Sequence, residues 1–194
     1  MPDPILIAMT GASGAIYGIE TLRLLKAIGR PAHLILSEVA RRTIEIETDV
    51  SVDEVKALAD VVHSNRDQAA CVSSGSYRTA GMLIAPCSIK TLSGIANSYA
   101  DNLIIRAADV TLKERRRLVL MVRETPYHTG HIELMRRATE AGAIIFPPMP
   151  AFYARPATID ELVRQSVGRA LDLFGIEHEE ITRWMGPGNS EAPS

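Results

Sequence analysis

The amino-acid sequence predicts an α/β fold, a doubly wound parallel sheet in a single domain with helices on both faces. Short, continuously apolar runs alternate with amphipathic stretches along the 194 residues, a pattern typical of strands that helices bury on both faces. Glycine and polar residues cluster directly after the apolar runs. Because parallel strands end at one edge of a sheet, these residues are expected to share that edge, where ligands bind.

Five strands and their connecting helices are expected. The first strand, Ile5–Met9, ends in the turn 10–14, and a helix follows from about Ala15 to Ile28, terminated by Gly29. The remaining strands are expected at 33–36, 82–85, 118–122 and 143–146. Further helices are expected at 38–47, after Ser51, after Ser88, and at 102–116, 131–141 and 159–174, the last with an apolar stripe.

Two segments fall outside this regular pattern. His63 to Thr79 is polar and rich in Ser and Gly, which predicts a functional loop. Residues 185–194 are rich in Gly, Pro, Ser and Glu, which predicts a disordered tail after a domain of residues 1–184.

Bulk composition excludes several classes of function. A formal net charge of -2 implies no polyanion-binding surface, so nucleic acid is not an expected partner. No apolar run approaches the ~20 residues that span a bilayer, and residues 1–4 lack the basic segment of a signal peptide. Cys71 and Cys87 are too few for a disulfide scaffold or a typical structural zinc site. A cytoplasmic protein without a membrane partner is expected.

The turn Thr10-Gly11-Ala12-Ser13-Gly14 lies between a strand and a helix. Small residues let the backbone approach a ligand, and a helix N-terminus favours an anion. The glycine spacing does not match G-x-G-x-x-G, and no Lys-Ser/Thr follows as in a Walker P-loop. The alternative is a tight turn with a Ser cap.

A second candidate is the helix start Cys87-Ser88-Ile89-Lys90-Thr91, whose hydroxyls and free N–H groups suit a phosphate or a flavin edge. The alternative is a capping Ser with a solvated Lys. Cys87, at a helix start, is a candidate reactive thiol, with simple packing as its alternative.

Charged residues supply further candidates. Arg106 and Lys113 are seven residues apart on one expected helix face, which suggests a phosphate site, with a solvated charged face as the alternative. Arg169 flanks the apolar stripe of the last helix, where a basic residue often only snorkels. Glu124, beside Arg123, is a candidate general acid or base, with a surface ion pair as the alternative. The histidines show no metal-ligand spacing, and no acidic cluster suits magnesium-diphosphate chemistry.

Together these segments resemble the flavin prenyltransferase (UbiX-like) family, including its branch associated with phenolic and aromatic acid decarboxylases. The resemblance covers residues 5 to about 184, and Arg106-Ala107-Ala108-Asp109-Val110 and Arg123-Glu124-Thr125-Pro126 are its most specific motifs. The other matching stretches are 9–15, 86–88, 112–114, 122–126, 150–153 and 183–184. The fold it implies is flavodoxin-like (Rossmann-like), so that residues 1–184 form a flavoprotein domain.

The resemblance implies a role for each matching residue. It implies catalytic roles for Glu124, which transfers a proton, and for Ser13 and Lys113. It assigns the phosphate of dimethylallyl monophosphate to Arg106, Lys113, Tyr153 and Arg169. It assigns FMN binding to Gly11, Ala12, Ser13, Ser37, Ser88, Ile89, Lys90, Thr91 and Arg123.

The resemblance also implies a metal-free reaction in which reduced FMN takes the dimethylallyl group at N5 and C6. The prenylated FMN serves a partner decarboxylase of the UbiD type. A homo-oligomer is implied, with a dodecamer as the candidate subunit number.

One departure concerns the loop before the third expected strand. Some relatives carry a Trp there, whereas this chain reads Asn65-Arg66-Asp67-Gln68-Ala69-Ala70, which changes the expected pocket lining around Gln68. Two rival functions stay open. A flavin-dependent cysteine decarboxylase would need an Asn that 86–91 lacks, and a non-catalytic FMN-binding subunit of an aromatic acid decarboxylase would use the same flavin residues.

Overall fold

The computed structural model describes residues 2–186. Its centre is a parallel sheet of six strands in the order β3-β2-β1-β4-β5-β6. The strands are β1 (Ile5–Met9), β2 (Ala32–Leu36), β3 (Val61–Ser64), β4 (Gly81–Cys87), β5 (Leu118–Val122) and β6 (Ile144–Ile145). Without the edge strand β3, this is the flavodoxin order, so the predicted doubly wound fold is confirmed.

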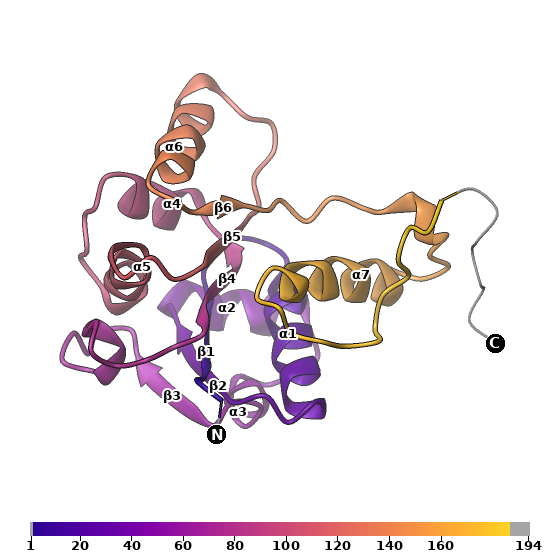
Figure 1. Cartoon of the computed structure of the whole chain (residues 1–194), viewed down its shortest axis with the longest axis horizontal. Coiled ribbons are helices and arrows are strands. Elements are labelled where there is room, and N and C mark those ends of the chain that lie inside the picture. Colours follow the sequence, from indigo (N-terminus) through magenta and orange to yellow (C-terminus); the bar gives the residue numbers. More distant parts are fainter. Residues whose placement is uncertain (1, 187–194) are drawn as a thin grey trace.

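Helices cover both faces of the sheet (Figure 1). One core lies between the sheet and α1 (Ala15–Ala27), α2 (Glu38–Glu47), α3 (Val52–Lys56) and α7 (Ile159–Asp172). The other lies under α4 (Ile89–Ala96), α5 (Leu103–Lys113) and α6 (Thr129–Glu140). Two 3-10 turns complete the fold, η1 (Cys71–Ser73) and η2 (Phe152–Ala154).

Most of the expected helices and strands form at the residues that the sequence pattern predicted, because local apolar runs and helix caps decide where each element begins and ends. α2 and β5 have the predicted bounds. Ser51 caps α3 through a reciprocal capping box with Glu54. Within residues 2–186, no helix combines the length and apolarity needed to cross a bilayer.

The prediction of five strands was wrong by one. β3 pairs with β2 along the sheet edge, but its side chains are largely exposed, so it lacks the apolar run that identifies a buried strand. The expected loop from His63 therefore begins inside this strand and also contains η1. Ile159, placed in the apolar stripe of α7, is 76% exposed. The tail predicted at 185–194 lies, from residue 187 on, outside the described residues.

Candidate functional site

The chain reverses its winding direction between β1 and β4, the central strands of the sheet. A crevice opens at the carboxyl ends of such a strand pair, and ligands bind there in doubly wound folds. Thr10 joins the two strand ends: its hydroxyl donates to the Pro86 carbonyl at 2.7 Å and accepts from the Ser88 amide at 2.8 Å. The predicted turn at 10–14 and the predicted helix start at 87–91 are therefore fixed side by side.

The N-terminus of α1 binds an anion, but this anion is a carboxylate of the chain itself. Glu47, the last residue of α2, accepts hydrogen bonds from the Gly14 amide at 2.8 Å and the Ala15 amide at 3.0 Å. Gly14 has φ 101°, a conformation that glycine adopts without strain. Two of the amides suited to a ligand phosphate at this helix start, those of Gly14 and Ala15, are thus already in use.

Glu47 also interacts with the candidate catalytic residue Ser13. Partial burial raises the pKa of Glu47. Hydrogen bonds from the Ser13 side chain and from the two amides, together with the charge of Arg123, outweigh this effect, so the pKa lies below its ordinary value. Glu47 is not among the site residues predicted from the sequence. A signal was available, because a carboxylate in the last turn of a helix opposes the helix dipole and needs a partner elsewhere.

The N-termini of α2 and α4 remain directed at the same edge. Ser37 caps α2 and accepts from the Ala40 amide at 3.0 Å. Ser88 caps α4, accepting from the Thr91 amide at 3.4 Å and donating to the Thr91 hydroxyl at 3.2 Å. Both caps were proposed as flavin contacts, and both helix starts retain first-turn amides suited to an anion.

Gly11 sets the distance between the β1 turn and α2. A Cβ atom at this position would lie 2.2 Å from Val39 Cγ1 and 2.6 Å from Val39 Cβ. Glycine is therefore required for the turn and the first turn of α2 to approach this closely.

Arg123 and Glu124 follow β5 at the same edge. The Arg123 amide donates to the Cys87 carbonyl at 3.1 Å, which ties this segment to β4. Within residues 2–186 the exposed Arg123 guanidinium has no carboxylate within ion-pair distance, although its charge acts on Glu47 and on Tyr17. Glu124 is half-buried and accepts from the Thr125 amide at 3.0 Å.

Cys87 is a packing residue. Its side chain is fully buried, and burial raises the pKa of the thiol to about 12. The thiol is therefore protonated at neutral pH and unreactive, which decides between the two alternatives for this cysteine.

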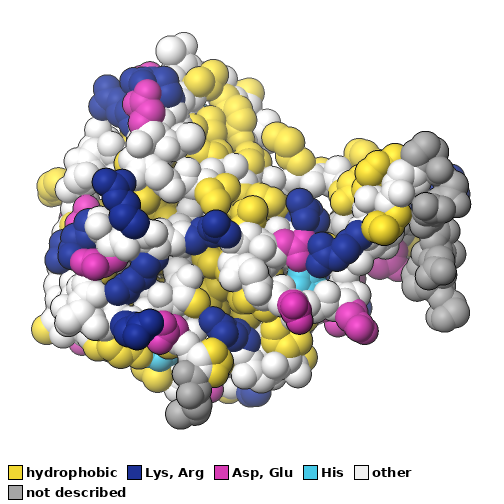
Figure 2. Space-filling model, viewed as in Figure 1, with side chains coloured by type: hydrophobic (Ala, Val, Ile, Leu, Met, Phe, Trp, Pro, Cys, Tyr) yellow, Lys and Arg dark blue, Asp and Glu magenta, His cyan; other side chains and the backbone are white. Residues whose placement is uncertain are grey.

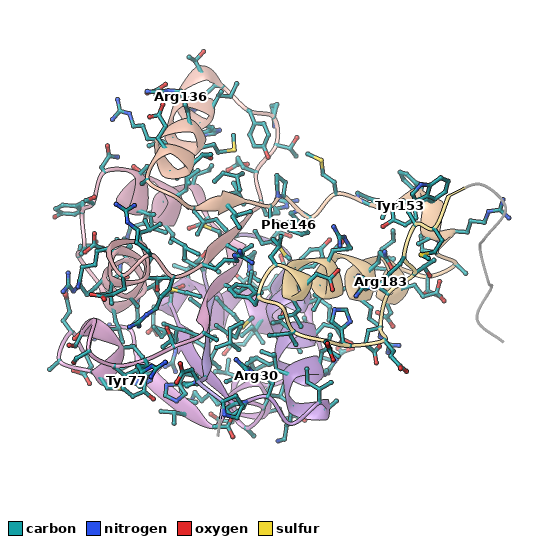
Figure 3. All side chains as sticks on the ribbon, viewed as in Figure 1. Arg30, Tyr77, Arg136, Phe146, Tyr153 and Arg183 are labelled. Carbon is teal, nitrogen blue, oxygen red and sulfur yellow. The ribbon has the colours of Figure 1, made fainter. Side chains whose placement is uncertain are left out.

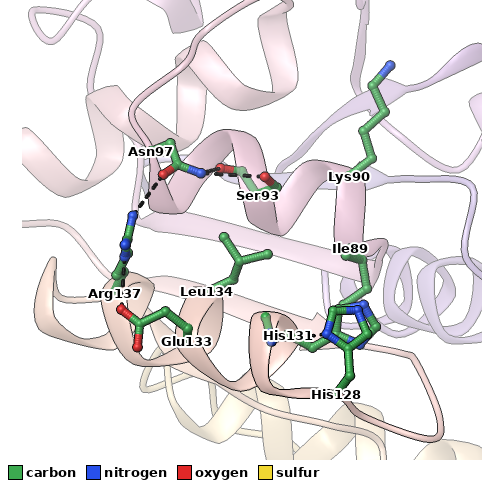
Figure 4. Close-up of a pocket in the computed structure, with 10 residues that line it drawn as sticks. Ile89, Lys90, Ser93, Asn97, His128, His131, Glu133, Leu134 and Arg137 are labelled. Atoms are coloured by element: carbon green, nitrogen blue, oxygen red, sulfur yellow. Dashed lines mark hydrogen bonds and ion pairs between the residues drawn. The ribbon is translucent and has the colours of Figure 1, made fainter.

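An open groove of about 470 Å³ adjoins this edge between α4 and α6 (Figure 4). Ile89 and Lys90, both candidate flavin contacts, lie at one end of it, and Arg137 and Asn97 close the other end through a 3.2 Å hydrogen bond. His128 caps α6 and stacks on His131 at 3.7 Å between ring centroids. His128 accepts from the Gly130 amide at 3.0 Å, so its role at this position is that of a helix cap.

The candidate substrate residues do not meet at this edge within one chain. Arg106 pairs with Asp109 at 3.0 Å and donates to the Ser73 carbonyl at 3.1 Å. Lys113, paired with Glu114, ends α5 just before β5 begins, and so lies toward the opposite, amino edge of the sheet. The roles assigned to these residues stay predictions.

Tyr153 lies on η2, in an arm that extends away from the sheet beyond β6 (Figures 1 and 3). Its ring contacts Trp184 edge-on at 6.0 Å between centroids. Figure 2 shows hydrophobic side chains exposed on this arm. The exposed residues include Met149, Phe152, Tyr153, Trp184 and Met185. Arg169, on α7, pairs with Asp172 at 2.7 Å.

Comparison with known proteins identifies close relatives. Residues 2–170 match the family model described as Flavoprotein. The chain is 56% identical over 182 residues to the flavin prenyltransferase UbiX of Thauera aromatica, with 94% of each chain covered. It is 50% identical to a crystal structure of AnUbiX (PadA1) in complex with FMN and dimethylallyl pyrophosphate, with a TM-score of 0.94 and coverage of 96% of this chain and 99% of that one. A dodecameric FMN-dependent UbiX-like decarboxylase from Escherichia coli O157:H7 is 49% identical, with a TM-score of 0.92 and coverage of 94% and 100%.

Proposed function

This chain belongs to the flavoprotein family and, within it, to the flavin prenyltransferases, and we propose that it transfers a dimethylallyl group from dimethylallyl monophosphate to reduced FMN. Relatives that cover most of the chain carry this activity in their names. This support is stronger than any available for a cysteine decarboxylase or for a non-catalytic flavin-binding subunit.

The observation that carries the proposal is the arrangement at the carboxyl ends of β1 and β4. Two helix N-termini, capped by Ser37 and Ser88, and the residue Arg123 all follow strands that end at this edge of the sheet. This donor set fits FMN, because amides at helix starts and an unneutralised Arg suit a phosphate and the polar edge of a flavin. Because Glu47 occupies the Gly14 and Ala15 amides at the start of α1, we assign the phosphate to α2 and α4.

When bound, reduced FMN would supply the nucleophilic ring atoms N5 and C6, to which two different carbons of the dimethylallyl group become attached. The side chains hold the donor and move protons. Arg106, Lys113 and Arg169 neutralise the departing phosphate, which needs charge-assisted hydrogen bonds as negative charge develops on it. Glu124, at the end of β5, transfers the proton that the flavin loses, and Ser13 is held in position by Glu47.

A homo-oligomer completes the site in this proposal. Arg106, Lys113 and Tyr153 lie on parts of the chain that do not converge on the flavin edge. The arm around η2 exposes five large apolar residues, as expected of a surface that another subunit covers. A relative's crystal structure is described as dodecameric. Light scattering of purified protein tests this, and a monomer with full turnover would remove the intersubunit site.

Prenylated FMN made by this chain would serve a UbiD-type decarboxylase, an expectation that rests on the family resemblance. Two donors are candidates, because a relative's structure contains dimethylallyl pyrophosphate, not the monophosphate. We favour the monophosphate because three basic residues and no acidic metal-binding cluster are assigned to the phosphate, whereas diphosphate chemistry commonly uses magnesium held by carboxylates.

The test is to mix protein with reduced FMN and each donor in parallel, and to measure the flavin mass. A mass increase of one dimethylallyl group, faster with the monophosphate and unchanged by EDTA, is expected. A flavin of unchanged mass with both donors contradicts the proposed transfer. Production of carbon dioxide from a peptidyl cysteine substrate would instead establish the decarboxylase.

A further inference from the structure

A cluster of two histidines and a cysteine lies away from the flavin edge. His33 is on β2 and His63 is on the neighbouring strand β3. Since Ile35 is opposite His63 in the register, the two imidazoles lie diagonally on one face of the sheet. The turn η1 brings Cys71 to this face, together with Tyr77, which Figure 3 labels near β3. His33 is four residues before Ser37, or about 13 Å along the strand from the flavin edge.

The spacing of the donor atoms suits a single metal ion. His33 Nδ1 and His63 Nε2 are 3.1 Å apart, and one ligand atom from each of His33, His63 and Cys71 lies within 4.8 Å of the other two. Two nitrogens on one tetrahedral zinc lie about 3.3 Å apart, and a nitrogen and a sulfur about 3.6 Å apart. The imidazoles are already close to this spacing, and the thiol must approach by at most about 1.2 Å, which its exposed place on a three-residue turn permits.

The electrostatic surroundings of the cluster also favour a cation. Burial lowers the pKa of His33, and the neighbouring His63 lowers it further, against the opposing charge of Asp60. Burial lowers the pKa of His63 as well, opposed by Asp67. The charges of Asp60 and Asp67 therefore add negative potential near the two rings, which favours a bound cation.

Tyr77 supplies the outer contact that metal-binding histidines commonly have. Its hydroxyl lies 3.4 Å from His33 Nε2, the ring nitrogen that would remain free if Nδ1 bound a metal. A partner at that position fixes the ring orientation and the tautomer.

We propose that His33, His63 and Cys71 form a binding site for one zinc-class divalent ion per chain, with water as the fourth ligand. The ion would replace the hydrogen bond between the imidazoles and displace the thiol proton to solvent. It would tie the exposed edge strand β3 and the turn η1 to β2, and so stabilise this side of the sheet without taking part in prenyl transfer.

The test uses purified oligomer freed of metal with a chelator and then titrated with Zn²⁺ by calorimetry. One Zn²⁺ per chain is expected, with a rise in Tm. Cys71→Ser and His63→Gln should each weaken binding by at least about tenfold, since even an outer contact is worth about 10- to 100-fold. X-ray absorption of the zinc-loaded protein should show one sulfur ligand, absent from Cys71→Ser.

His128→Gln is the matched control, because His128 and His131 form the other close histidine pair in the described chain. This variant should bind Zn²⁺ like the wild type. The proposal fails if the wild type binds no Zn²⁺ at micromolar concentration. It fails equally if Cys71→Ser and His63→Gln bind as tightly as the wild type, or if His128→Gln abolishes binding. Both key positions are at least partly exposed, so these variants are expected to fold.

Discussion

Replacing Gly11 with alanine should displace α2, and this displacement should in turn weaken FMN binding. The new Cβ would be 2.6 Å from Val39 Cβ, which no side-chain rotation can move, whereas ordinary contact begins at 3.4 Å. The turn and the first turn of α2 must therefore separate by about 0.8 Å, which exceeds the spread of normal hydrogen-bond lengths. We expect a loss of about 1–3 kcal/mol in the free energy of unfolding, the usual cost of overpacking.

The same displacement moves the α2 amides away from the flavin phosphate. Losing one charge-assisted hydrogen bond should raise the Kd for FMN roughly ten- to a hundred-fold. Denaturant unfolding gives the stability, and quenching of flavin fluorescence gives the affinity. Both must change in Gly11→Ala if the geometry at α2 positions the flavin.

A double variant isolates the contact. Val39→Gly removes both clashing atoms and leaves the next neighbour at 3.7 Å, at a cost of about 1 kcal/mol for glycine in a helix. Gly11→Ala combined with Val39→Gly should be about as stable as Val39→Gly alone, and should recover most of the FMN affinity. Strictly additive losses would refute the steric reasoning, because residues without contact do not couple.

Four further outcomes are expected. Ser37→Asp places a negative charge at the proposed phosphate site and should weaken FMN binding, so unchanged affinity by fluorescence titration would count against that site. Glu124→Gln should keep FMN but lose most prenylation by the mass assay, because an amide cannot exchange the proton, and a wild-type rate would exclude Glu124 from the mechanism. Arg169→Ala should raise the donor concentration needed for half-maximal rate roughly ten- to a hundred-fold. The FMN content should stay intact, because Asp172, which pairs with Arg169, still keeps Arg183 as an ion-pair partner. Loss of flavin would instead place Arg169 in the cofactor site or the fold. The pKa of Glu47 is lowered from 4.5 on folding, so its contribution to the free energy of unfolding is full above pH 4.5 and is lost as the pH falls through the folded pKa. Glu47→Gln should therefore lose less stability in acid than the wild type when unfolding is measured as a function of pH. An identical acid profile would exclude the Glu47 contact with α1.

The sequence by itself determined the fold class, and it predicted the edge of the sheet at which the site should lie. A strand buried on both faces must be apolar along its length, and a helix must begin with a cap, so both features are written locally in the chain. Ser37, Ser88 and Arg123 could be proposed as site residues in this way, because each directly follows a strand. Cys87 could be named as a candidate, but only its complete burial showed that it packs.

The tertiary structure decided what depends on contacts between distant segments. β3 forms through backbone pairing with β2, and its exposed side chains carry no apolar signal. Glu47 reaches the amides of α1 across 33 residues, and His33 meets His63 across 30 residues. Such contacts arise from strand order and helix placement, which burial patterns along the chain do not encode. For the same reason, the sequence could name Arg106, Lys113 and Tyr153 as one substrate site, but only the folded chain reveals that they lie on separate parts of the subunit.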